Sequence, residues 1–308
     1  MSELRTAAAD YLAVRRGLGF KLRGHERLLG ELADFLEESG TTTLTSELAL
    51  RWATARPGVE PVRWGQRLAA ARGFARYLHA LDPAVEVPPA DLLPVRRERP
   101  TPWLYSAADI DALLAAAAAL RPPLRAVTHE TLFGLLAVTG MRLGEALHLD
   151  RDDIDWRAGT LLIRDAKFGK SRRLPLHPST VAALARYAER RDAWCPAPRA
   201  PSFFLSTRGT RLLDTCVHAV FIELLARAGL DARAGSGRPR VHSLRHSFAM
   251  ATIRDWYAAG ADVAGRLPIL SAYLGHAHPA STYWYLQAAP ELLALAADRL
   301  ERSAGTAR

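Results

Sequence analysis

The sequence predicts a mainly α-helical protein with one small β-sheet, built from two domains joined by a linker. Apolar residues recur at helical spacing through residues 1–88. A proline-rich stretch then interrupts the pattern. After it, short segments rich in branched and aromatic residues appear among further helical patterns, so we expect strands only in the second domain.

Residues 1–88 are expected to form a small all-helical bundle. Helical periodicity appears in three or four segments, within residues 7–19, 25–40, 45–56 and 63–81. The second of these ends at Gly40, and the third begins at a threonine and a serine suited to capping a helix.

The linker is expected over residues 89–103. Six prolines fall within residues 82–102, and proline at this density breaks helices and favours an extended chain. Arg96, Arg97 and Arg99 make this stretch locally basic.

Residues 104–308 are expected to form the second domain. Helices are predicted over residues 106–120, capped by Ser106, and over residues 123–140, ending at Gly140. Two strands follow at 159–166 and 171–177, joined by a hairpin turn around Gly169. The sequence then predicts a helix at 179–191, a short strand at 202–206 and more helices to about residue 303.

Composition excludes several classes of protein. A hydrophobic fraction of 49% with 24% charged residues is ordinary for a globular chain. The sequence has no run of about 18 apolar residues and no secretion signal, so we expect no membrane association. Two cysteines, Cys195 and Cys216, provide neither a disulfide framework nor a zinc site, which favours a cytoplasmic location.

The net charge indicates a polyanionic partner. The chain carries a formal charge of +9, with 15 Lys/Arg against 13 Asp/Glu in residues 1–100 and 26 against 19 in the remainder. A basic excess concentrated in the second part is typical of proteins that bind nucleic acid, although many basic proteins do not.

Three clusters in the second part carry residues suited to chemistry, and each also has a purely structural interpretation. Arg142 and Glu145 alone read as a helix start with an ion pair three residues apart. In residues 241–250, a histidine, an arginine and a second histidine share one helical face, which alone is compatible with a basic surface. Residues 274–287 hold histidines and tyrosines that alone favour aromatic packing.

In this order and at this spacing, the clusters resemble the tyrosine recombinase (phage integrase) family, which includes Xer-type and transposon integrases. "TGMRLGEALHLDRDDID" is similar to the family's first motif, "HSLRHSFA" to its second, and "YLGHAHPASTYWYL" to the segment that carries its nucleophile. The resemblance covers roughly residues 105–300. It implies a helical, SAM-like core-binding domain ahead of an α+β catalytic domain.

The resemblance also implies a reaction. A tyrosine hydroxyl attacks a DNA phosphodiester, forms a 3′-phosphotyrosyl link and releases a 5′-hydroxyl, with no metal and no other cofactor. Because negative charge builds on the phosphate oxygens, fixed guanidinium groups are suitable partners, and Arg142 and Arg245 match the family's two. The family's general acid is a lysine on a β-hairpin; Lys167 aligns better than Lys170, which stays as the alternative.

The remaining assignments follow from the same resemblance. His242 matches the histidine that exchanges a proton with the tyrosine, and His276 matches the His or Trp near the phosphate. Tyr285 lies nine residues after His276, the family's spacing, whereas Tyr283 is expected to pack beside Trp284.

Neighbouring residues are expected to have supporting roles or none. Glu145 is expected to orient Arg142, His246 is given no chemistry, and His278 is expected to face solvent. Five residues are expected to contact DNA, namely Arg96, Arg97, Arg99, Lys170 and Arg172.

Double-stranded DNA at specific recombination sites is the expected partner, gripped from both sides by the two domains. We expect a homotetramer on DNA and a monomer or dimer when free. The terminal segment after Tyr285 is amphipathic and is expected either to dock on a neighbouring subunit or to pack on its own domain. Two alternatives stay open: a type IB topoisomerase-like enzyme and a catalytically silent DNA-binding protein. The biological role and the need for a second recombinase or an accessory protein also stay open.

Overall fold

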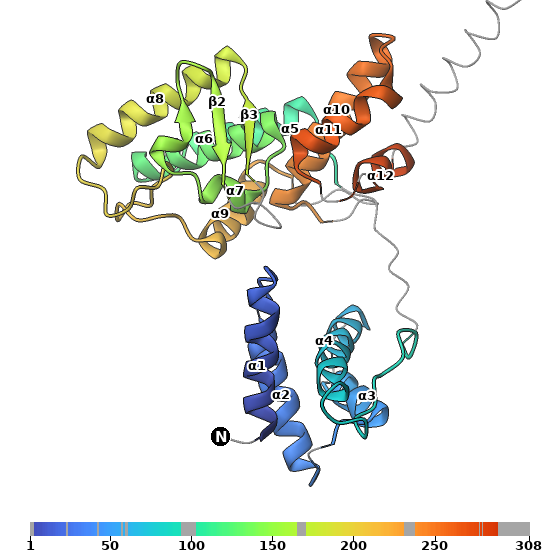
Figure 1. Ribbon diagram of the computed structural model, residues 1–308. Coiled ribbons are helices and arrows are strands. Elements are labelled where there is room, and N and C mark those ends of the chain that lie inside the picture. Colours follow the sequence, from blue (N-terminus) through green and yellow to red (C-terminus); the bar gives the residue numbers. More distant parts are fainter. Residues whose placement is uncertain are drawn as a thin grey trace, which may run out of the picture. The chain divides into compact units, whose positions relative to one another are not determined.

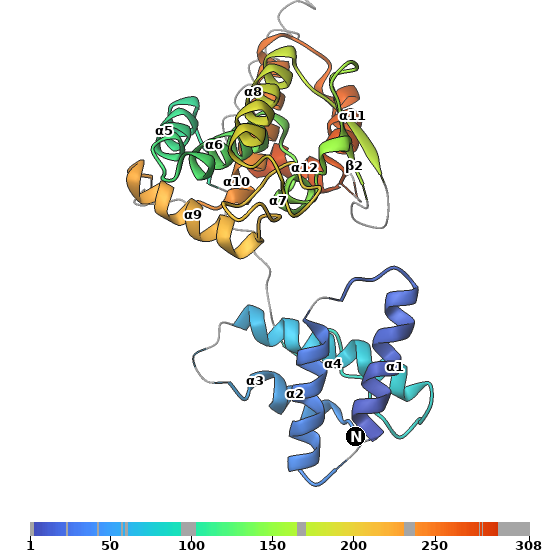
Figure 2. The same cartoon turned by 90° about the vertical axis from the view of Figure 1, so that its left-hand side faces the viewer.

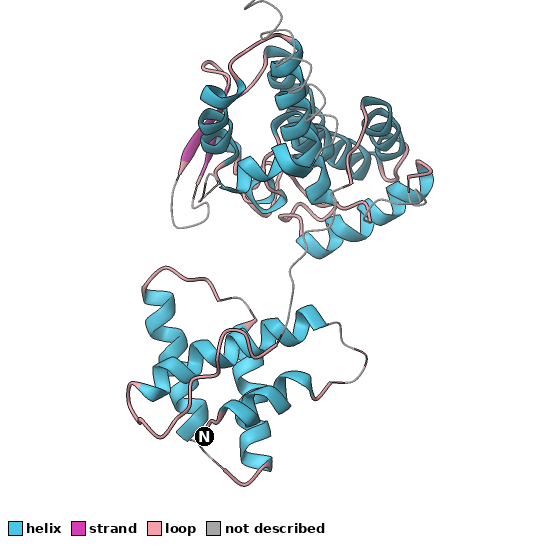
Figure 3. Cartoon of the chain, turned by 90° about the vertical axis from the view of Figure 1, so that its right-hand side faces the viewer, coloured by secondary structure: helices cyan, strands magenta, loops and turns pink. Residues whose placement is uncertain are grey.

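The structure is a computed structural model of the 308-residue chain. It describes residues 3–22, 24–41, 43–56, 58, 61–93, 103–164, 171–230, 238–276, 278 and 280–288. The chain divides into two compact units, Met1–Arg99 and Pro100–Arg308 (Figure 1). Helices dominate both units, and among the residues described here strands occur only in the second (Figure 3), which confirms the predicted fold class.

The first unit is an all-helical bundle. Its helices are α1 (Glu3–Gly17), α2 (His25–Glu38), α3 (Ser46–Thr54) and α4 (Pro61–His79). Each helix turns an apolar stripe inward, and the largest buried side chains in the shared core include Trp52, Phe74 and Leu36. The side chain of Thr45 accepts a hydrogen bond from the backbone of Leu48 and so caps α3.

The second unit holds most of the helices that the structure describes. They are α5 (Ala107–Ala118), α6 (Pro123–Thr139), α7 (Leu143–Leu147), the 3₁₀ helix η1 (Arg151–Asp153), α8 (Pro178–Trp194), α9 (Asp214–Arg227), α10 (Val241–Ala258), α11 (Val263–Leu274) and α12 (Ala280–Ala288). The predicted cap at Ser106 is present as a capping box with Asp109. The predicted end at Gly140 is also present, in the left-handed conformation.

A three-stranded antiparallel sheet lies beside these helices. Its strands β1 (Ile154–Asp155), β2 (Thr160–Ile163) and β3 (Arg172–Pro175) pair in sequence order. Leu161 and Leu174 are register partners and both are buried, so alternate residues of β2 and β3 face the core. The sequence predicts β2 and β3 but not β1, because two residues are too few to show a period.

One predicted strand is wrong. The sequence favours a strand over residues 202–206, yet the structure forms none there, and Ser202 and Leu205 make only isolated bridges. Phe203 and Phe204 are buried in the core. They give the segment a strand-like composition, but no neighbouring strand runs beside it for a ladder to form.

Helices α10, α11 and α12 share a second, smaller core. Figure 2 shows α12 beside α10, and the two helices contact each other and α11. Buried side chains of this cluster include Ile253, Leu267, Leu274 and Tyr285. The ends of α6 and α11 therefore meet the start of α10, which places three motifs that are distant in sequence next to one another.

Among the residues that the structure describes, no helix has both the length and the apolar character needed to cross a membrane. Within the same residues, no group of three or more His, Cys, Asp or Glu side chains is placed to hold a metal ion.

Gly140 provides a test of how α6 meets α10 and α11. Its φ is +59°, and an added Cβ would lie 2.5 Å from Phe248 Cδ1 and 3.0 Å from Leu274 Cδ2. We expect Gly140→Ala to lower the free energy of unfolding by about 2 kcal/mol or more, through backbone strain and overpacking. Urea denaturation of the full chain measures the change.

Gly144→Ala is the matched control. Gly144 lies in α7, and a Cβ there would meet nothing within 4 Å. Alanine at this position should leave stability unchanged or raise it by about 0.5–1 kcal/mol. Equal losses in the two variants would contradict the packing described at Gly140.

Candidate active site

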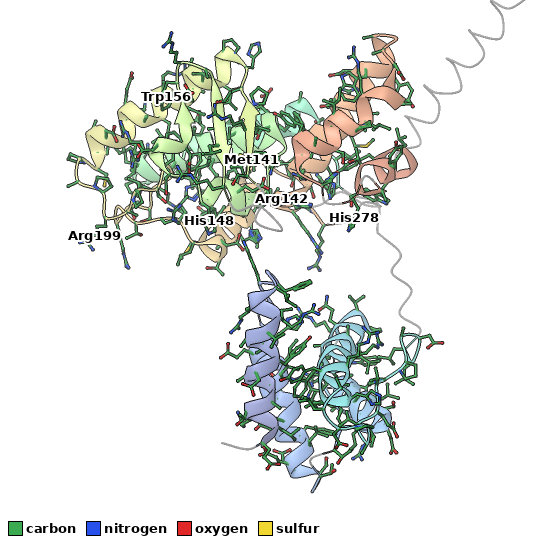
Figure 4. The ribbon with its side chains drawn as sticks, in the orientation of Figure 1. Met141, Arg142, His148, Trp156, Arg199 and His278 are labelled. Atoms are coloured by element: carbon green, nitrogen blue, oxygen red, sulfur yellow. The ribbon has the colours of Figure 1, made fainter. Side chains whose placement is uncertain are left out.

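The residues singled out by sequence come from three segments of the second unit. Arg142 directly precedes α7, and His242, Arg245 and His246 lie on the first two turns of α10. His276 follows α11, and Tyr285 lies in α12. Arg142 and His278 are labelled in Figure 4.

Arg142 is held at the end of α11. Its Nη2 donates to the carbonyl oxygen of Gly275 at 2.7 Å, and its Nη1 donates to Glu145 Oε1 at 2.7 Å. The backbone N–H of Arg142 also donates to Glu145 Oε2 at 3.0 Å. Glu145 therefore fixes both the backbone and the guanidinium of Arg142, the orienting contact expected from the sequence.

Arg245 reaches the same place from α10. Its side chain is buried, and its Nη1 and Nη2 donate at 2.8 Å each to the carbonyl oxygens of Gly140 and Leu274. The end of α6 and the end of α11 thus bind one guanidinium between them. Burial, followed by the neighbouring charge of Arg142, lowers the pKa of Arg245 to about 10, so it stays protonated at neutral pH.

A third arginine joins this group from β3. Arg172 donates from Nη1 to Glu145 Oε1 at 3.0 Å and from Nη2 to Glu145 Oε2 at 2.9 Å. Its Nε and Nη2 also donate to the carbonyl oxygens of Tyr273 and Leu274, at 3.1 and 3.3 Å. Arg172 is expected from the sequence to contact DNA, whereas in the structure its guanidinium points into the protein.

The local charge is strongly positive even with Glu145 present. Burial alone would raise the pKa of Glu145, but hydrogen bonds from Arg172 and from the Arg142 backbone hold it below its usual value. The site therefore holds three guanidinium groups and one carboxylate, which contacts two of them, and the carbonyls at the C-terminal end of α11 add only partial negative charge. Such a site favours an anion that offers several oxygen atoms.

Three histidines stand around this positive site. Burial lowers the pKa of His246 to about 4, with His242 and Arg245 adding to the effect. Burial also lowers the pKa of His276 to about 4, with Arg245 and Arg142 contributing. The His242 ring reaches the surface over densely packed neighbours, and partial desolvation, then Arg245 and Arg142, lower its pKa too. At neutral pH these imidazoles are uncharged and can accept a proton.

Tyr285 points into this histidine group. The side chain is only 2% exposed, and its hydroxyl forms a 3.0 Å hydrogen bond with His246 Nδ1. The His276 ring lies nearly parallel to the Tyr285 ring, with 6.3 Å between centroids. His276 is itself oriented by a 2.6 Å hydrogen bond between its Nδ1 and Thr282 Oγ1.

Tyr283, two residues before Tyr285, faces solvent. Tyr283 is 45% exposed, so the expectation that it packs beside Trp284 is wrong. Side chains two positions apart on a helix point in directions that differ by about 200°. Tyr283 therefore faces solvent while Tyr285 faces α10. His278 is exposed, which confirms the solvent-facing prediction for it.

Several predicted residues lie outside the described part of the chain. Lys167 and Lys170, the two candidates for the general acid, are among them. The linker arginines Arg96, Arg97 and Arg99 and the amphipathic terminal segment beyond residue 288 are as well.

Known proteins are similar to this chain over most of its length. Residues 105–291 match the Phage integrase family. The putative integrase/recombinase y4rB of Sinorhizobium fredii is 47% identical to this chain over 308 residues, which cover 98% of each protein. The chain belongs to the phage integrase family of tyrosine recombinases.

Two further proteins are similar to the recombinase, one in sequence and one in fold. The tyrosine recombinase XerD of Mycobacterium tuberculosis is 31% identical to it over 302 residues, 90% of each chain. The solved structure of the XerH site-specific recombinase bound to a palindromic difH substrate covers 90% of this chain and 79% of its own. That match has a TM-score of 0.68 at 18% identity and supports the fold. The recombinase is thus an enzyme that breaks and rejoins DNA at specific sites.

Two residues of the recombinase site have contacts that sequence reasoning missed. His246 touches the Tyr285 hydroxyl although no chemistry was assigned to it. Its place four residues after His242, on the same helical face, was the available signal. Arg172 was grouped with DNA-contacting residues, and only its alternation with Arg173 along β3 could have suggested an inward-facing side chain.

The partly buried neutral histidines predict a specific pH dependence of stability. The pKa of His246 is about 4 in the folded chain against 6.5 as its ordinary value. Between these values the unfolded chain binds more protons, so stability should fall as pH drops from 7 to 5. His246→Gln removes one such group. Between pH 7 and 5 this variant should therefore lose less stability than the unmodified chain, as measured by thermal unfolding at each pH.

His278→Gln serves as the control for this measurement, because that ring is exposed. It should lose as much stability as the unmodified chain between pH 7 and 5. An identical loss in His246→Gln would show that His246 is not a buried neutral group.

Proposed function

We propose that this recombinase cuts DNA with Tyr285 as its nucleophile and binds the scissile phosphate with Arg142 and Arg245. The observation that carries the proposal is the convergence of both arginines on the Leu274–Gly275 turn. The same turn continues into His276 and then into α12, which holds Tyr285. Phosphate clamps and nucleophile are therefore tied to one short segment of chain.

The two proposed clamps have donors to offer a phosphate. Within the described residues, the guanidinium hydrogen bonds of Arg142 and of Arg245 each engage two of five N–H groups. The remaining N–H groups can bind the non-bridging oxygens, on which negative charge builds in the transition state. Loss of such a donor typically lowers a rate by about 10²–10³-fold.

The proposed reaction exchanges one phosphodiester for another. The Tyr285 oxygen bonds to phosphorus, the bond to the 5′-oxygen breaks, and the protein carries a 3′-phosphotyrosyl link. The tyrosine proton passes to His242, and Lys167 protonates the leaving 5′-oxygen, with Lys170 as the alternative donor. The 5′-hydroxyl of another strand then reverses these steps and joins a new partner.

The lowered pKa of His242 supports its proposed role, because a neutral imidazole can take the proton. In the free chain, however, the Tyr285 hydroxyl is bound by His246 and buried. We therefore propose that α12 shifts when DNA binds, which brings the hydroxyl to the phosphate and to His242. His276 is proposed to bind or pack near the phosphate.

The proposal extends to the DNA contacts, the oligomeric state and the biological role of the recombinase. The first unit and the linker arginines Arg96, Arg97 and Arg99 would contact the DNA backbone, with Lys170 beside them. The enzyme would act in the cytoplasm as a tetramer on paired sites, a monomer or dimer when free, with the terminal segment docked on a neighbouring subunit. Its role would be mobile-element integration or transposition, or Xer-like resolution, with or without a second recombinase or accessory protein.

Two alternative functions fit the chain less well. All the catalytic positions of the family are filled, which argues against a catalytically silent DNA-binding protein. The separate helical unit argues against a type IB topoisomerase-like enzyme.

Substitution of the nucleophile tests the proposal. A binding site is first enriched from a randomised duplex library on the Tyr285→Phe chain and then prepared as a set of nicked suicide duplexes. Tyr285→Phe should form no covalent protein–DNA adduct on denaturing gels and should still bind the duplex, because only one hydroxyl is lost. Tyr283→Phe, the control on the opposite face of α12, should form the adduct normally. An adduct in Tyr285→Phe would eliminate Tyr285 as the nucleophile.

The choice of general acid has its own test. Lys167→Ala should lower the rate of adduct formation by about 10²–10⁴-fold, the usual contribution of a positioned proton donor. A duplex whose 5′-bridging oxygen is replaced by sulfur should restore the rate, because a thiolate leaves without a proton. Lys170→Ala should need no such rescue. The reverse pattern would assign the proton to Lys170.

A further inference from the structure

The three arginines at the end of α11 are not equivalent. Within the described residues, the guanidinium hydrogen bonds of Arg142 and Arg245 each engage two of five N–H groups. Arg172 engages four of five: two to Glu145, one to the Tyr273 carbonyl and one to the Leu274 carbonyl. Its side chain is 16% exposed, so it has little capacity left for a phosphate.

Arg172 controls how Glu145 faces Arg142. Glu145 Oε1 accepts hydrogen bonds from both Arg142 Nη1 and Arg172 Nη1, and Glu145 Oε2 accepts from the Arg142 backbone and from Arg172 Nη2. The bidentate contact with Arg172 thus fixes the plane of the carboxylate. With that plane fixed, Arg142 can form both of its contacts with Glu145 at once.

Arg172 also contacts the turn that the other two arginines use. It binds the carbonyl oxygens of residues 273 and 274, whereas Arg245 binds that of Leu274 and Arg142 that of Gly275. An added Cβ on Gly275 would lie 2.6 Å from Arg172 Nη1 and 2.8 Å from Cζ. The guanidinium of Arg172 therefore packs directly against the Gly275 backbone, and a side chain at position 275 would displace it.

We propose that Arg172 is a positioning residue for recombination, which locks Glu145 against the end of α11 and thereby holds Arg142 and Arg245 in register for the phosphate. The inference rests on the proposed function, because it takes Arg142 and Arg245 as the phosphate clamps. Arg172 itself contacts no DNA. Its effect on cleavage passes through the two clamps.

Arg172→Lys and Arg172→Ala test this role, with Arg173→Ala as a matched control from the exposed neighbour on β3. Lysine keeps the charge but cannot bridge a carboxylate and two carbonyls, so Arg172→Lys should fold and still misplace the clamps. We expect both Arg172 variants to lower the rate of adduct formation on the enriched suicide duplex by about 10- to 100-fold at saturating protein. Arg173→Ala should cleave at the rate of the unmodified chain.

DNA affinity separates positioning from a phosphate contact. If Arg172 only positions other residues, the dissociation constant of Arg172→Lys and Arg172→Ala should change by less than about twofold, and its dependence on salt should not change. Loss of a phosphate contact would weaken binding and reduce the slope of log K against log salt by about one in Arg172→Ala. That second result would overturn the proposal and restore the DNA-contact interpretation of Arg172.

A double-mutant cycle shows whether the effect passes through Arg142. Arg172→Ala should cost several-fold less in cleavage rate when Arg142→Lys is already present than in the unmodified chain, because the clamp it positions is already impaired. Equal factors in the two backgrounds, together with a lowered thermal midpoint, would mean that Arg172 merely stabilises the fold.

The same cycle keeps the two proposals apart. Normal cleavage by Arg142→Lys and by Arg142→Ala would refute the assignment of Arg142 as a clamp, whatever Arg172 does. Slow cleavage by the Arg142 variants with normal cleavage by both Arg172 variants would refute the positioning role alone.

Discussion

The geometry of the second unit depends on the C-terminal end of α11, where three guanidinium groups bind three consecutive carbonyls and two of them share one carboxylate. Like charges about 5 Å apart repel by about 3 kcal/mol at an effective dielectric constant of about 20. Hydrogen bonds to charged groups contribute about 1.5–3 kcal/mol each, so several of them can hold the cations together. The helix end supplies oriented carbonyls that would otherwise lack intrahelical partners. Segments 133 residues apart in sequence, Arg142 and Gly275, are joined in this way.

The same positive charge organises the groups around it. Burial, and after it neighbouring charges that include Arg245, lowers the pKa of His242, His246 and His276 and so keeps potential proton acceptors neutral beside a site for an anion. A phosphate would reduce this repulsion, and a tyrosinate would as well. The electrostatics that make the free site costly to assemble therefore favour the charge that develops during the reaction.

Much of this arrangement could be predicted from the sequence, for identifiable reasons. Ser106 and Gly140 mark helix ends through their local chemistry. The family's spacing points to Tyr285, and the structure places this residue, unlike the exposed Tyr283, against His246. The inward orientation of Arg172 could not be predicted. Side chains alternate between the two faces of β3, and which face is buried depends on what packs against the sheet. The strand predicted at residues 202–206 does not form for a related reason. Apolar composition indicates that a segment is buried, but a strand also needs a neighbouring strand to pair with.

A substitution at Gly275 would affect two other positions, Arg172 and Glu145. The residue ends α11 at a φ of +69°, and the Arg172 guanidinium occupies the space of its missing side chain. A larger residue at position 275 would displace the Arg172 guanidinium, and with it the two hydrogen bonds that Arg172 donates to Glu145. Redesign of this enzyme's DNA specificity should therefore keep Gly275, Arg172 and Glu145 or change all three together. New DNA contacts should be introduced at other positions.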